Sequence, residues 1–228
     1  MKATFIVGLL FITLTAFAKG EKKVHIHIYP SYNNKPIVLD DMYYHNPNGD
    51  SILFETFRCY ISGIAFYLND SLVLEEKNSY HLVDASDDKT LNIVIHPSED
   101  IVFNNVRFNL GIDSAMNMVG VMGGDLDPAN GMYWTWQSGY INLKLEGKSN
   151  RCATRGNKFH FHLGGFSAPN NALQKIRVVT NTSDIQIAIA IDKFLDKVDI
   201  TKQNSVMIPG AEAVDLSKKI ARSVIIQE

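Results

Sequence analysis

In the segment Val24-His25-Ile26-His27-Ile28-Tyr29, aliphatic side chains (Val or Ile) alternate strictly with histidine or tyrosine side chains. Because successive side chains on a β-strand point to opposite faces, this alternation predicts a strand with one buried face. Runs rich in aromatic and β-branched residues recur along the chain between clusters of Gly, Asn, Pro and Ser, at 52–68, 72–74, 80–83, 91–95, 102–110, 132–146, 158–163, 175–179 and 185–191. Short strands at this spacing predict an all-β fold, an antiparallel β-sandwich.

Two segments depart from the strand pattern. Residues 111–131 have little periodicity and are rich in Gly, Asp, Asn and Met, so we expect a long ordered loop over one end of the domain. Residues 211–225 place apolar side chains at helical intervals, which predicts a short amphipathic C-terminal helix.

Composition and charge narrow the class of protein. The chain has 228 residues, of which 46% are hydrophobic, and 22 basic residues against 24 acidic ones leave a net charge of −2. Lys and Arg never cluster beyond two in a row, so a surface that tracks nucleic-acid phosphates is not expected.

The N-terminus carries a targeting pattern. Lys2 precedes an apolar run over 3–14, and Ala16-Phe17-Ala18 follows as a small-residue cleavage pattern. This pattern predicts a signal peptide at 1–18. Residues 19–228 then form a single exported domain, periplasmic or secreted, and no later run is long and apolar enough for a membrane span.

The two cysteines, Cys59 and Cys152, allow two interpretations. In an oxidising compartment an even pair is a candidate disulfide. Alternatively, both remain thiols, and Cys59 packs beside Phe57 and Ile61 on one face of a strand.

Two His-x-His pairs are candidate metal ligands, His25 with His27 and His160 with His162. Residues two apart on a strand point to the same side, so two imidazoles can converge on one transition-metal ion. The alternative is that each pair decorates a solvent face. The single residues His45, His81 and His96 are expected at the surface.

The aromatic block at 131–140 holds both tryptophans. By alternation Trp134 and Trp136 share a face, where they either fill the core or form, with Tyr140, a stacking platform for sugar rings. Motifs of nucleophilic or nucleotide chemistry are missing, so we expect a protein that is not an enzyme. A zinc-dependent hydrolase built on one His-x-His pair is a weaker hypothesis, because no Glu or Asp stands at an obvious position for its base.

Together with this block, three motifs resemble the MbnP-like family of exported copper-binding proteins: Asn109-Leu110-Gly111-Ile112-Asp113-Ser114, the turn at 124–128, and Phe161-His162-Leu163-Gly164. The resemblance covers nearly all of residues 19–228. It implies a periplasmic β-sandwich that binds one copper ion, as Cu(I), in acquisition, storage or handling of copper. In some members a ligand is a kynurenine, made from Trp by a partner diheme enzyme related to MauG and bacterial cytochrome c peroxidases.

Carried onto this sequence, the resemblance makes Trp134 the candidate for modification and His162 the first candidate ligand. His160, His25 or His27 would supply a second ligand, with the ion between the two His-bearing strands. Trp136 stands where a related branch has a ligand His. The alternative function is a carbohydrate- or protein-binding β-sandwich without metal.

Overall fold

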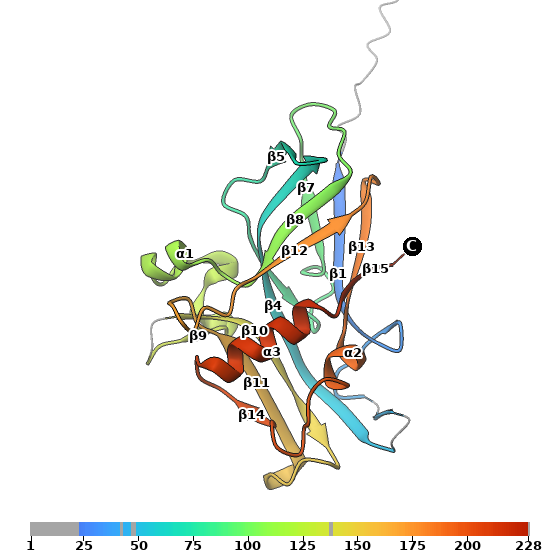
Figure 1. Cartoon of the computed structure of the whole chain (residues 1–228), viewed down its shortest axis with the longest axis vertical. Helices are drawn as coiled ribbons and strands as arrows, with labels where there is room; N and C mark the ends of the chain where they lie inside the picture. The colour runs from blue at the N-terminus through green and yellow to red at the C-terminus, as the bar shows by residue number, and fades with distance from the viewer. Residues whose placement is uncertain (1–22, 42, 47–48, 137–138, 228) are drawn as a thin grey trace, which may run out of the picture.

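The computed structural model describes residues 23–41, 43–46, 49–136 and 139–227, and these form two β-sheets with three short α-helices (Figure 1). The predicted signal peptide at 1–18 lies outside the described residues. None of the described helices has the length and apolar character needed to cross a lipid bilayer.

The larger sheet, with ten strands among the described residues, runs in the order β12-β8-β4-β10-β11-β14. Four further short strands pair with it, β3, β5 and β6 with β4, and β9 with β10. The strand bounds are β3 (Tyr44–His45), β4 (Ser51–Leu68), β5 (Ser71–Glu75), β6 (Tyr80–Asp84), β8 (Asn105–Leu110), β9 (Tyr133–Trp134), β10 (Gly139–Ser149), β11 (Lys158–Gly164), β12 (Gln174–Val179) and β14 (Ser205–Val206).

The smaller sheet, five strands in the described part of the chain, runs β15-β13-β1-β2, and β7 also pairs with β1. Its bounds are β1 (Val24–Tyr32), β2 (Lys35–Pro36), β7 (Asn92–Ile95), β13 (Asp184–Ala190) and β15 (Val224–Gln227). Val24, Ile26 and Ile28 are buried, as the alternation of the first segment predicts.

One hydrophobic core joins the two sheets. Ile26 and Ile187 of the smaller sheet belong to the same buried cluster as Phe57, Leu145 and Phe161 of the larger sheet. The predicted all-β sandwich is therefore confirmed. Among the described strands, two pairs are parallel rather than antiparallel, β1 with β13 and β11 with β14, and each joins strands far apart in the sequence.

The C-terminal helix is confirmed but is shorter than predicted. Helix α3 (Ala211–Ala221) buries Ala213, Leu216 and Ile220 and contacts β11 and β12. Val224, expected on this helix, instead begins β15 and pairs with Ile189 of β13. Figure 1 shows α3 lying across the strands, with the C-terminal strand beyond it.

Two other segments differ from expectation. The predicted loop at 111–131 contains α1 (Ser114–Val119), which starts because the Asp113 side chain accepts a hydrogen bond from the Met116 amide. The predicted strand at 132–146 is divided into β9 and β10, and α2 (Ile191–Leu195) follows directly after β13. The division separates the two tryptophans, since Trp134 lies on β9 and Trp136 lies beyond its end.

Candidate metal centre

The hairpin of β10 and β11 carries the site. On β11, Phe159, Phe161 and Leu163 are buried in the core, so the alternating residues His160 and His162 point to the opposite, outer face. On β10, Glu146 pairs with His160 and Lys144 pairs with His162. Directly paired side chains of neighbouring strands lie on the same face, which brings Glu146 to both histidines.

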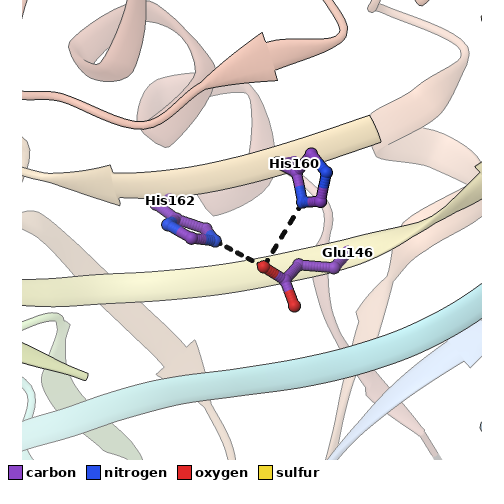
Figure 2. A group of neighbouring side chains, drawn as sticks. All are labelled: Glu146, His160 and His162. Carbon is purple, nitrogen blue, oxygen red and sulfur yellow. Dashed lines mark hydrogen bonds and ion pairs between the residues drawn. The ribbon is translucent and has the colours of Figure 1, made fainter. Parts of the chain in front are cut away.

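One carboxylate oxygen meets both imidazoles. His162 Nε2 lies 2.7 Å and His160 Nδ1 lies 3.4 Å from the same Oε1 atom of Glu146 (Figure 2). The three ligand atoms lie within 4.8 Å of one another. Among the described residues this is the only group of three or more His, Cys, Asp or Glu side chains placed to share an ion.

The site is graded from buried to open. The His162 side chain is 9% exposed, while those of Glu146 and His160 are 24% and 31% exposed. The hydrogen bond from His162 lowers the pKa of the Glu146 carboxyl to about 2, and Thr56 and His160 add to this effect against the opposing cost of burial. Glu146 is therefore ionised at neutral pH, and an incoming metal ion has no proton to displace from it.

Trp134 lies further along the same face. A Cβ atom built at Gly164 would lie 2.6 Å from Cζ3 of Trp134, so the indole covers a position that only glycine leaves open. Gly164 is two residues beyond His162 on β11, which places it on the same face of the strand, about 7 Å further along. Trp134, the candidate for modification, therefore contacts the strand that carries both histidines.

Two basic side chains hold the segment that leads into β9. Arg58 Nη1 donates to the Asn130 carbonyl at 3.0 Å, and Lys144 Nζ donates to the Gly131 carbonyl. Arg58 is itself paired with Asp84 at 2.6 Å. These contacts tie the start of the aromatic block to the outer face of β4 and β10, and so fix where Trp134 lies.

The structure does not bring His25 and His27 to this site. Both lie on β1, in the smaller sheet, whereas His160 and His162 lie on β11 in the larger sheet. His27 Nδ1 lies 2.9 Å from Asn92 Oδ1, and its ring packs on Tyr29. The expectation of an ion between the two His-bearing strands is therefore wrong. The alternation in the sequence predicts that the imidazoles of each pair lie on one face of their strand, but it does not predict which sheet that strand joins.

The cysteines are separate thiols. Cys59 and Cys152 are both free and buried, so the candidate disulfide is not formed. Cys59 lies on β4 among the buried Phe57 and Ile61, as the alternative interpretation expects. Cys152 lies after β10, where its Sγ contacts the Ile200 carbonyl oxygen at 3.8 Å.

Glu146 is the site residue that the sequence does not single out. Its strand alternates Leu143 and Leu145 with Lys144 and Glu146, the same phase that β11 shows. Placing Glu146 opposite His160, however, requires the register of the hairpin, which depends on the shape of the connection at 150–157. The alternation thus predicts that Glu146 lies on the outer face of β10, but it does not predict that His160 lies opposite Glu146.

The three aromatic residues of the sugar-binding alternative do not form an exposed stacking platform. Trp134 is 7% exposed and Tyr140 is 1% exposed, while Trp136 is 62% exposed. The two indole rings lie 6.0 Å apart but only Trp136 presents a face to solvent. Tyr140 is held inside by its hydroxyl, which donates to the Leu126 carbonyl at 3.1 Å.

Comparison with known proteins gives two matches. The model of the MbnP family matches residues 21–208. Among solved structures the chain is similar to MbnP from Methylosinus trichosporium, with a TM-score of 0.56 and 13% sequence identity over 84% of this chain and 86% of that chain. No curated protein matches the chain. At this identity the structural likeness shows a common fold.

Proposed function

The chain belongs to the MbnP family, and from this premise we propose that it is an exported, non-enzymatic copper-binding protein that holds one Cu(I) ion at His160, His162 and Glu146. The observation that carries the proposal is the convergence of both imidazoles on one ionised carboxylate. The copper ion is the cargo of the protein, taken up, stored or handed on in the periplasm or outside the cell.

The donor set supports a transition metal. Imidazole nitrogens suit copper and zinc, and two or three such ligands close together are a common protein site for either ion. The carboxylate adds a negative charge beside a cation, in a position where His162 is largely shielded from solvent. The family resemblance implies copper, and His160 at the exposed side leaves a route by which the ion enters.

Replacement of His162 by Ala tests this proposal. We expect the variant to bind Cu(I) at least about 10-fold more weakly than the wild type, since it removes the buried ligand and the hydrogen bond that orients Glu146. The measurement is competition against a Cu(I) chelator under anaerobic conditions, with far-UV circular dichroism to confirm folding.

His81→Ala is the matched control. His81 Nε2 also contacts a carboxylate, Glu76 Oε2 at 2.8 Å, but within the described part of the chain this pair belongs to no group of three ligating side chains. Its loss should leave the Cu(I) affinity within about 2-fold of the wild type. Equal affinities for the wild type and both variants would refute a site at His162.

We also propose that Trp134 is converted to kynurenine by a partner diheme enzyme related to MauG and bacterial cytochrome c peroxidases. The net reaction consumes dioxygen and water and releases the indole C2 carbon as formate, leaving an aryl amine that can bind copper. Trp134 lies next to a cavity of about 80 Å³ lined also by Phe166 and Pro209. This volume has room for a small reactant beside an otherwise buried ring.

Peptide mass spectrometry tests the modification. Protein isolated from its native host should show, at Trp134, the loss of one carbon and the gain of one oxygen. Protein made alone in a heterologous host should keep the indole, because the side chains of the chain itself supply no redox cofactor for the oxidation. The exposed Trp136, on the same peptide, is the internal control, and an intact Trp134 in copper-bound native protein would refute this step alone.

A further inference from the structure

Strand β14 lies beside β11 at the edge of the larger sheet (Figure 1). The two strands are parallel, with Ser205 opposite His160 and Val206 opposite Phe161. Val206 is buried in the core, as Phe161 is, while Ser205 is exposed. The chain continues to Met207, which is 43% exposed. Ser205 and Met207, on either side of the buried Val206, are thus both open to solvent.

The strand pairing ends at Val206, but the chain stays close to β11 beyond it, since a Cβ atom built at Gly165 would lie 3.1 Å from Cβ of Pro209. This course brings Met207, the residue after Val206, towards His162, the residue after Phe161. The methionine side chain has three rotatable bonds and adapts its sulfur position easily. On the other side of His162, the paired residue is Lys144, whose ammonium donates to the Gly131 carbonyl and offers no lone pair. Of the two side chains that flank His162, Met207 is therefore the one with a lone pair, on its thioether sulfur, that can bind a metal ion.

We propose that Met207 is a further ligand of this metal site and that its thioether makes the site select Cu(I) over Zn(II). This inference rests on the proposed function. Two imidazoles and a carboxylate form a donor set that zinc accepts readily, so His160, His162 and Glu146 do not by themselves favour copper. A thioether is a soft ligand that suits Cu(I) and adds little for Zn(II).

The exposure of Met207 also bears on how a copper ion would reach the site. His162 is buried while Met207 is open to solvent, so an arriving ion meets the sulfur before it reaches the buried imidazole. An exchange partner that carries Cu(I) on sulfur ligands could pass the ion to Met207 without releasing it to water. The selectivity and this sulfur-based route, which is separate from the opening at His160, then depend on the same side chain.

Met207→Leu separates this inference from the proposed function, because leucine keeps the size and apolar character of methionine without the sulfur. We expect Cu(I) affinity to fall about 10-fold and Zn(II) affinity to stay within about 2-fold of the wild type. Met118→Leu is the matched control, since Met118 is 74% exposed on α1 and should change neither affinity. X-ray absorption of the Cu(I)-loaded proteins should find a sulfur neighbour in the wild type and in Met118→Leu, but none in Met207→Leu.

The outcomes are distinct. Suppose that Cu(I) binding is lost in His162→Ala and unchanged in Met207→Leu, and that X-ray absorption of the wild type finds no sulfur neighbour. This result overturns the role of Met207 and leaves the proposed copper site at His162 intact. A wild type whose Cu(I) binding does not depend on His162 overturns both. An equal loss of Cu(I) and Zn(II) affinity in Met207→Leu overturns the selectivity and points to a packing role.

Discussion

Gly147→Ala should lower the free energy of unfolding by about 3 kcal/mol or more, one of the two largest effects expected from a single substitution in this chain. A Cβ atom at Gly147 would lie 2.1 Å from the Leu53 carbonyl oxygen and 2.7 Å from Cζ of Phe159. The carbonyl oxygen belongs to the backbone of β4 and cannot rotate away as a flexible side chain can. The alanine variant must therefore push β4 and β10 apart.

The close approach lies at a shift in the register of the two strands. The pairing of β10 with β4 shifts between Glu146, opposite Thr56, and Gly147, opposite Phe54. Bulges bend a strand locally and re-aim the neighbouring side chains. The extra residue at this shift is Glu55 of β4, and Glu146 pairs with Thr56 directly beside it, so the close approach at Gly147 adjoins the metal-site carboxylate in the sequence.

Urea unfolding of the metal-free protein, followed by far-UV circular dichroism, measures the effect. Gly123→Ala is the control, because Gly123 has an extended backbone, with φ −94° and ψ −174°, and no heavy atom within 4 Å of its Cβ position. It should change stability by no more than about 0.5 kcal/mol. Similar stabilities of the two variants would mean that β4 and β10 do not approach as closely as described.

The parts of the fold that are predictable from the sequence are those that a local pattern determines. Alternation predicts the strand that carries His160 and His162 and tells that both face away from the core. The helical spacing of Ala213, Leu216 and Ile220 predicts α3, because these residues pack on one side of it. In each case the pattern follows from burial of one face of a single element.

The parts that are not predictable depend on how elements are paired. His25 and His27 show the same alternation as His160 and His162, yet β1 joins the smaller sheet. Glu146 reaches the histidines through the hairpin register, and the proposed ligand Met207 directly follows a parallel strand that pairs with β11 from far away in the sequence. Two of the four candidate ligands, Glu146 and Met207, therefore depend on which strands pair and in which register. No local pattern in a single sequence determines that pairing.

Phe161→Ala should lower the free energy of unfolding by about 3–5 kcal/mol, the range for loss of a fully buried aromatic side chain. Phe161 is 0% exposed and lies on β11 between His160 and His162. Its ring packs edge-on against Phe194 of α2, with centroids 5.8 Å apart, and against Phe159 at 5.6 Å. Truncation leaves a cavity between a strand and a helix that are each held by other contacts, so the site cannot collapse to fill it.

The stability should be measured by urea unfolding with and without Cu(I), using Met118→Ala as the exposed control. In the metal-free state, a Phe161→Ala loss below about 1 kcal/mol would contradict the packing described for β11. A ligand at 100 times its Kd stabilises the folded state by about 2.7 kcal/mol. If Phe161 only fills the core, this increment should survive in the variant. If it is lost while the variant still folds, the ring also holds the backbone of β11 where His160 and His162 can meet one ion.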